Sequence, residues 1–268
     1  MIHTLLLLAA AAPRILSADF CADQLVLALA DREQIAGLST DADKDFSHLR
    51  ERAGGLPQAR ADAEGAIATD ADVVLRFWGG DRPRLERLGI GVETLDYAAD
   101  FDAVKRNVMR AAKAMGQPER GAALNGQIDS RLRALASRGH TGVTALYVTP
   151  GGVTAGRETM IDAIMTAAGV TNAAAQAGLS YWPPLSAEAV ITNPPQFIVA
   201  GFFASASERI NHWSAARHPA IRRVLFETPG VAPSEDVLSC PGPQSVDAAE
   251  AIRDAVDAST RSPAAAAR

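Results

Sequence analysis

The order of short apolar segments and helical segments constrains the fold of this chain most, because the two alternate in two separate runs. The first run is expected to hold strands at residues 14–17, 34–39, 72–78 and 92–97 and helices at 22–30, 61–69 and 83–88, with a loop at 41–60. The second run is expected to hold strands at residues 144–149, 197–203 and 224–228 and helices at 159–168, 186–191 and 245–258. Strands that alternate with helices form parallel sheets covered on both faces, so the sequence predicts an α/β protein.

Two long helices are expected between these runs. The first has one apolar stripe at helical spacing, formed by Phe101, Val104, Val108, Ala111 and Met115. Asp100 stands at its N-cap position and Gly116 closes its end. The second helix would be about 30 Å long. The expected organisation is two α/β lobes joined by one long helix, with an N-terminal lobe at 13–116, a connecting helix at 117–138 and a C-terminal lobe at 139–260.

The two runs share a sequence pattern. Glu64 stands eight residues before Asp72, which leads into an expected buried strand, and Glu188 stands eight residues before Gln196, which leads into another. Each glutamate has a local interpretation, because the helix dipole favours an acidic residue in a first turn by about 0.3–1 kcal/mol. The alternative is a shared role, in which two acidic knobs contact a two-fold partner. The sequence leaves both interpretations open.

Aromatic residues are only 5% of the chain, so their positions are informative. Phe77 and Trp78 end an expected strand, Tyr181 and Trp182 lie in an expected loop, and Phe20 follows the first strand. Ligands of open α/β sheets bind beyond the carboxyl ends of the strands, where large rings can stack on a bulky ligand. We therefore expect ligand contacts from these residues. The alternative is that the tryptophans pack under their own loops.

A glycine-rich loop follows the strand expected at 144–149 and ends at Arg157. It lacks the G-x-G-x-x-G spacing of dinucleotide-binding loops. Arg157 is either a partner for an anionic ligand group or an ordinary surface arginine.

The chain has two cysteines, Cys21 and Cys240, which excludes a disulfide scaffold and a four-cysteine zinc site. In an exported protein they are expected to pair as a disulfide. The alternatives are two free thiols near a cleft, or a soft ligand to a bound metal complex. A catalytic cysteine needs a nearby base. Four histidines show no helpful spacing for that role: His48, His140, His212 and His218.

Composition narrows the class of protein further. With 48% hydrophobic and 21% charged residues, bulk disorder is excluded. The net charge of −5 argues against a nucleic-acid binder. The apolar run in residues 1–12 predicts a signal peptide, although a buried first helix of a cytosolic protein is the alternative. The Pro/Ala-rich tail at 261–268 is expected to be disordered.

Residues 13–29 (PRILSADFCADQLVLAL), 64–75 and 182–199, with the long connecting helix, resemble the periplasmic binding proteins of ABC importers for iron–siderophore complexes and vitamin B12. The resemblance covers nearly the whole chain after Pro13. It implies two Rossmann-like lobes with parallel sheets, joined by a long rigid helix. It also implies a monomeric periplasmic protein that holds a metal chelate between the two lobes, carries no cofactor and performs no chemistry. It also implies that Glu64 and Glu188 dock into arginine pockets of a dimeric ABC permease in the inner membrane.

The resemblance also bears on the ligand contacts. Family members carry tryptophans in the cleft where Trp182 and Phe77 stand, and a lysine where Arg157 stands. This chain departs from the pattern, because Ala168 replaces a cysteine of a C-lobe disulfide and no aromatic residue stands near Gln58. The chelate therefore stays open among ferric hydroxamate, ferric catecholate, ferric citrate, haem and corrinoid.

The sequence thus predicts the substrate-binding component of an ABC importer, which captures a ferric siderophore or cobalamin-like corrinoid and delivers it to the permease. The predicted ligand contacts are Phe20, Cys21, Phe77, Trp78, Arg157, Tyr181, Trp182 and Cys240. Two alternatives remain. One is a cysteine-dependent periplasmic enzyme or redox protein that uses Cys21 and Cys240, and the other is a non-transport sensor on the same fold.

Overall fold

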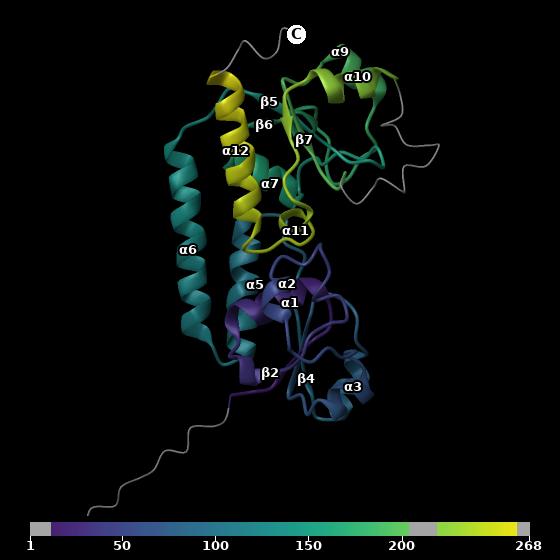
Figure 1. Ribbon diagram of the computed structural model, residues 1–268, viewed down its shortest axis with the longest axis vertical. Helices are drawn as coiled ribbons and strands as arrows, with labels where there is room; N and C mark the ends of the chain where they lie inside the picture. Colours follow the sequence, from purple (N-terminus) through teal and green to yellow (C-terminus); the bar gives the residue numbers. More distant parts are fainter. Residues whose placement is uncertain (1–11, 204–218, 262–268) are drawn as a thin grey trace, which may run out of the picture. The chain divides into compact units, whose positions relative to one another are not determined.

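The computed structural model describes residues 12–203 and 219–261 (Figure 1). The expected signal peptide, apart from Ala12, and the expected disordered tail, apart from Arg261, lie outside these residues, as do His212 and His218. The chain divides into two compact units. Unit 1 comprises Met1–Asp43, Leu49–Leu95 and Met109–Gly121, and unit 2 comprises Lys44–His48, Asp96–Val108 and Ala122–Arg268.

Unit 1 contains a four-stranded parallel sheet in the order β2-β1-β3-β4. Its strands are β1 (Ile15–Ser17), β2 (Ile35–Gly37), β3 (Val73–Arg76) and β4 (Gly91–Thr94). Its helices are α1 (Phe20–Leu29), α2 (Arg50–Ala53), α3 (Ala63–Ala68) and α4 (Arg82–Arg87), with a 3₁₀ turn at Arg32–Gln34. Leu16 of β1 and Val74 of β3 are fully buried in its core together with Leu85 of α4, so the short apolar runs do form the centre of the sheet.

Unit 2 contains a second four-stranded parallel sheet in the order β6-β5-β7-β8. Its strands are β5 (Thr144–Val148), β6 (Thr171–Asn172), β7 (Phe197–Ala200) and β8 (Gly230–Val231). Its helices include α7 (Met160–Ala167), α8 (Ala173–Gln176), α9 (Ala187–Thr192), α10 (Pro219–Glu227), α11 (Glu235–Leu238) and α12 (Ser245–Arg261). Helix α12 packs against α7 (Figure 1).

The two sheets have the same connectivity. In each, the first strand in the chain lies between the second and the third, and the fourth lies outside the third. Helices α3 and α9 therefore occupy equivalent places, each leading into the third strand of its own sheet. The α/β class with two parallel sheets is confirmed, and the repeat seen in the sequence corresponds to a repeat in the fold.

Two long helices occupy the middle of the chain, namely α5 (Phe101–Ala114) and α6 (Pro118–Ser137). The apolar stripe expected on α5 is buried, with Val108 and Met115 fully inaccessible. The division into units falls within both helices, after Val108 in α5 and after Gly121 in α6. The compact units therefore do not coincide with the expected segments 13–116 and 139–260, and those lobe boundaries stay a prediction. None of the helices in the described residues has the length and apolar character needed to span a bilayer.

The strand expected at residues 224–228 is wrong, because residues 224–227 belong to helix α10, which ends at Glu227. Ile221 is buried and Val224, three residues later, packs on the same apolar cluster, which is helical rather than strand spacing. Arg223 also pairs with Glu227 at 3.7 Å, the spacing of one helical turn. The apolar run at 224–226 misled the prediction, and the edge strand β8 forms later, at Gly230–Val231.

Candidate ligand-binding site

Unit 1 carries an aromatic surface beyond the carboxyl ends of two neighbouring strands. Phe20 opens α1, which follows β1, whereas Phe77 and Trp78 follow β3. The rings of Phe20 and Trp78 lie 5.5 Å apart and meet edge to face at 72°, and those of Phe77 and Trp78 lie 6.3 Å apart. The Trp78 side chain is still 49% exposed. Phe20, Phe77 and Trp78 are named the unit 1 aromatic surface below.

A buried carboxylate positions this surface. Asp19 is the N-cap of α1, and its Oδ1 accepts a 2.9 Å hydrogen bond from the backbone N–H of Ala22. Its Oδ2 accepts hydrogen bonds from the backbone N–H groups of Phe77 at 2.7 Å and Trp78 at 3.2 Å. Burial raises the pKa of Asp19, and the backbone N–H groups around it oppose that rise. Sequence reasoning missed Asp19, although an aspartate directly before a helix is an N-cap signal.

The loop after the unit 1 aromatic surface is closed by its own backbone and by one arginine. Gly79 and Gly80 both have positive φ angles, of 74° and 66°. The guanidinium of Arg76 donates hydrogen bonds to the carbonyl oxygens of both glycines. The Arg76 guanidinium therefore stabilises this loop.

Unit 2 carries an aromatic pocket of about 240 Å³. It is lined by Tyr97, Tyr147, Trp182, Phe202 and Cys240, together with apolar side chains of α7. The ring of Trp182 meets that of Tyr147 edge to face at a centroid distance of 6.3 Å, and the Trp182 side chain is 46% exposed. These residues are named the unit 2 aromatic pocket below. Trp182 and Cys240 were expected at the ligand, whereas Tyr97, Tyr147 and Phe202 were not.

Tyr147 is the fully buried member of this pocket. Its hydroxyl has no hydrogen-bond partner among the described residues, and burial raises its pKa, so it stays a protonated donor. The hydroxyl lies against the backbone of Gly201, where a Cβ atom would come within 2.2 Å of it. From the sequence alone, Tyr147 reads as one more core residue of β5, so nothing marked it as a site residue.

Two of the four contacts predicted in unit 2 do not line this pocket. Arg157 and Tyr181 instead join two loops, because the N–H of Tyr181 donates to the carbonyl of Arg157 at 2.8 Å. The Nε of Arg157 donates to the carbonyl of Ala175 at 3.1 Å. The hydroxyl of Tyr181 interacts with Glu158, which raises the pKa of Tyr181. Both residues are exposed, and their roles as ligand contacts stay predictions.

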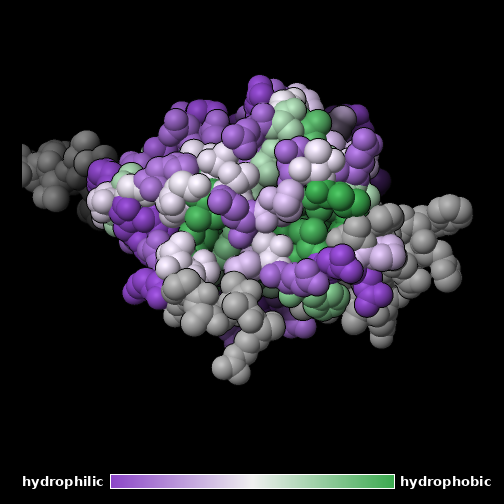
Figure 2. All heavy atoms as spheres, turned by 90° about the horizontal axis from the view of Figure 1, so that it is seen from above, coloured by the Kyte–Doolittle hydropathy of each residue, from purple (hydrophilic) through white to green (hydrophobic). Residues whose placement is uncertain are grey.

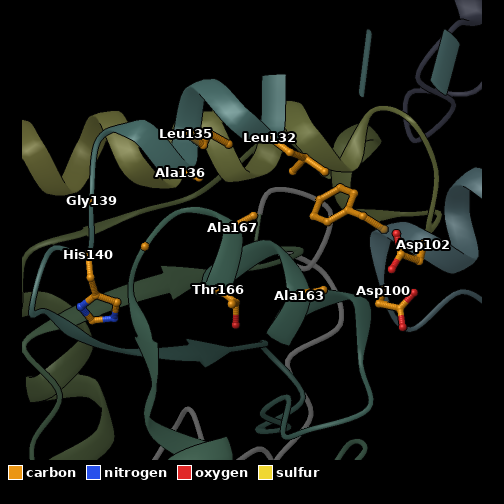
Figure 3. A pocket seen from close by; sticks show the side chains of 12 residues that line it. Asp100, Asp102, Leu132, Leu135, Ala136, Gly139, His140, Ala163, Thr166 and Ala167 are labelled. Carbon is orange, nitrogen blue, oxygen red and sulfur yellow. The ribbon is translucent and has the colours of Figure 1, made fainter. Parts of the chain in front are cut away.

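Two other cavities lie in unit 2. One, of about 540 Å³, lies along α6 and α7, with Asp100 and Asp102 at one end and His140 at the other (Figure 3). The other, of about 1170 Å³, lies beside α8 and α9 and is lined mainly by small and apolar side chains. None of the predicted ligand contacts lines either cavity. The described residues also contain no group of three or more His, Cys, Asp or Glu side chains that would hold a metal ion.

Both cysteines are buried, and neither is a free thiol. In this structure neither cysteine is therefore available as a thiolate nucleophile, which is the group that a cysteine-dependent enzyme needs.

Glu64 and Glu188 have matching local structures. Each is the second residue of a six-residue helix, α3 or α9, and each is exposed. The preceding caps also match, since Asp62 accepts from the N–H of Gly65 at 2.9 Å and Ser186 from the N–H of Ala189 at 3.2 Å. Both glutamates stand in the first turn of a helix, where the helix dipole favours a negative charge. The equivalent places of the two helices are also compatible with a shared role.

The sequence matches the periplasmic binding protein family over residues 18–210. The chain belongs to this family. A cobalamin-binding protein of Halobacterium salinarum is 26% identical over 246 residues, which are 87% of this chain and 66% of that relative. The chain therefore spans about two thirds of the length of this relative.

Solved structures agree with the assignment. The periplasmic haem-binding protein RhuT from Roseiflexus sp. RS-1 is 25% identical, with a TM-score of 0.70 over 91% of this chain and 99% of that chain. The vitamin B12-binding protein BtuF of Vibrio cholerae, at 19% identity, a TM-score of 0.67 and coverage of 93% and 98%, shares the fold. These relatives are named for solutes that they bind, and the family to which this chain belongs is a family of binding proteins.

Proposed function

We propose that this periplasmic binding protein is the substrate-binding component of an ABC importer and that its cargo is a metal chelate with a flat macrocycle, haem or a corrinoid. One observation carries the choice of cargo: each unit presents exposed aromatic rings beyond the carboxyl ends of its strands, with Trp78 in unit 1 and Trp182 in unit 2. Large rings stack well on a flat apolar macrocycle.

The relatives support the same choice. A cobalamin-binding protein and a haem-binding protein are each named for a chelate with a macrocycle.

Binding is tested by calorimetric titration of the purified, mature protein with haemin, cyanocobalamin, ferrioxamine B and ferric citrate. We expect tight one-to-one binding of haemin or cyanocobalamin, which weakens about tenfold or more in Trp78→Ala and in Trp182→Ala. Phe226→Ala is the matched control, because this exposed aromatic residue lines none of the described cavities and is not a predicted ligand contact. Binding of only a siderophore or citrate would overturn the macrocycle, and binding of none would overturn the importer role.

We also propose that the protein acts as a periplasmic monomer and delivers its cargo through Glu64 and Glu188, which contact the two subunits of the permease. Their exposure and their equivalent places on α3 and α9 support this role. The double variant Glu64→Ala with Glu188→Ala is expected to lose transport and to keep the wild-type affinity for its cargo. Unimpaired transport by the double variant would refute the docking role.

Finally, we propose that Cys21 and Cys240 are joined to each other by a disulfide. The chain has two cysteines, both are buried, and neither is free. Export to an oxidising compartment favours such a bond.

A further inference from the structure

Each docking glutamate is followed, three residues later, by an exposed isoleucine. Ile67 follows Glu64 on α3 and is 63% exposed, and Ile191 follows Glu188 on α9 and is 56% exposed. Residues three apart on a helix lie on the same face. Glu64 with Ile67 is named the α3 patch, and Glu188 with Ile191 the α9 patch.

Buried neighbours set this orientation in the same way in both helices. Ala66, directly before Ile67, is fully buried in the core of unit 1, and Val190, directly before Ile191, is buried in the core of unit 2. The matching N-caps fix where each helix begins. The glutamate and the isoleucine therefore point outward together in both helices.

Folding gives no reason for these isoleucines. A side chain that stays more than half exposed gains little from burial, and isoleucine is a weaker helix former than alanine. Much of the face seen in Figure 2 is hydrophilic, with apolar side chains reaching it in a few places. A single exposed apolar residue is ordinary. The same residue type at the same place in both halves is a recurrence that the folding of either unit does not require.

We propose that Ile67 and Ile191 are the apolar contacts of two equivalent docking patches, each of which binds one subunit of the dimeric permease. The inference rests on the proposed function and deepens it. Two patches of equal chemistry on one chain fit a partner that presents the same surface twice. The chemistry specifies that surface as a cation, which pairs with the glutamate, beside an apolar recess for the isoleucine.

The test measures docking of the full-length mature protein to its permease–ATPase complex in lipid nanodiscs, by biolayer interferometry and by stimulated ATP hydrolysis. Ile67→Ser with Ile191→Ser is expected to weaken docking about tenfold or more, and each single change is expected to weaken it less. Ile67→Val with Ile191→Val is expected to dock nearly as the wild type. Thermal unfolding and cargo affinity should not change in either variant, since both side chains are exposed and line none of the described cavities.

Leu88→Ser is the matched control, because Leu88 is a 48% exposed apolar residue at the end of α4. Equal weakening by Leu88→Ser would mean unspecific apolar adhesion and would overturn the inference. Wild-type docking by the isoleucine pair, with docking lost in Glu64→Gln with Glu188→Gln, would overturn the inference and leave the proposed function standing. Wild-type docking by both double variants would overturn both.

Discussion

The Oδ2 atom of Asp19 accepts a 2.7 Å hydrogen bond from the backbone N–H of Phe77. The same carboxylate caps α1 through Ala22, so one side chain connects the start of α1 to the end of β3. Phe20 and Trp78, whose rings meet edge to face, stand on either side of this connection. The unit 1 aromatic surface therefore depends on a residue that does not itself present a ring to the ligand.

Asp19→Ala is expected to lower the free energy of unfolding by about 2–4 kcal/mol, because it removes an N-cap and leaves two backbone N–H groups without their charged acceptor. It is also expected to weaken cargo binding about tenfold, since Phe77 and Trp78 lose their anchor. Chemical denaturation and calorimetry measure the two effects. Asp62→Ala is the control, because Asp62 caps α3 through its bond to Gly65, and α3 carries no aromatic residue. It should cost about 1 kcal/mol and leave binding intact. Unchanged binding in Asp19→Ala would show that the surface does not need this anchor.

Tyr147→Phe is expected to separate stability from binding. The buried hydroxyl has no partner among the described residues, so its removal should leave the ligand-free protein as stable as before or stabilise it by about 1 kcal/mol. If the hydroxyl donates to an acceptor on the cargo, the same change should weaken binding about threefold to tenfold. Calorimetry and thermal unfolding of the same sample give both values. Tyr97→Phe, which removes an exposed hydroxyl from the same pocket, is the control. If only Tyr97→Phe weakened binding, the hydroxyl that donates to the cargo would be that of Tyr97 and not that of Tyr147.

The sequence predicted the parallel sheets because short β-branched and leucine-rich runs such as those around Val74 and Ile198 have no other place than a sheet core. It also predicted that the rings of Trp78 and Trp182 reach the surface, because Trp78 follows a strand and Trp182 stands beside two prolines. Contact of these rings with a ligand stays a prediction. It missed Tyr147 because a tyrosine within a buried strand has the same pattern whether or not its hydroxyl finds a partner. It missed α10 because Val224, Leu225 and Phe226 form an apolar run whose period is too short to distinguish a helix from a strand.

The proposed disulfide between Cys21 and Cys240 can be tested without a ligand. Unfolded, unreduced protein is expected to show no titratable thiol, and non-reducing peptide mapping should recover Cys21 and Cys240 in one linked fragment. Because the bond would close a loop of most of the chain, Cys21→Ser with Cys240→Ser should lower the free energy of unfolding by about 2–5 kcal/mol. Ser17→Ala is the control for a change in the buried core of unit 1, because it removes a hydroxyl that donates to the carbonyl of Asp19 and interacts with Asp23, and it leaves both cysteines in place. Two titratable thiols in the unfolded, unreduced protein would refute the bond.

The buried carboxyl of Asp23 is expected to make the free energy of unfolding depend on pH. It is fully buried on α1, and burial raises its pKa to about 6 even though Ser39 donates hydrogen bonds to it through its N–H at 2.9 Å and its hydroxyl at 2.6 Å. Between the ordinary pKa of 3.8 and about 6, the folded protein holds a proton that the unfolded chain has released. The stability that Asp23 contributes is therefore complete below pH 3.8 and falls as the pH rises to about 6, by roughly 3 kcal/mol in total.

Asp23→Asn stays neutral and can still pair with Ser39, so its free energy of unfolding should match that of the wild type near pH 4 and exceed it by about 2–3 kcal/mol at pH 7. Guanidinium unfolding of the wild type and of Asp23→Asn at pH 4, 5, 6 and 7 measures the difference between their free energies of unfolding. Titratable groups that both proteins share contribute equally and cancel in this difference. Two parallel stability profiles would show that Asp23 titrates as an ordinary carboxyl.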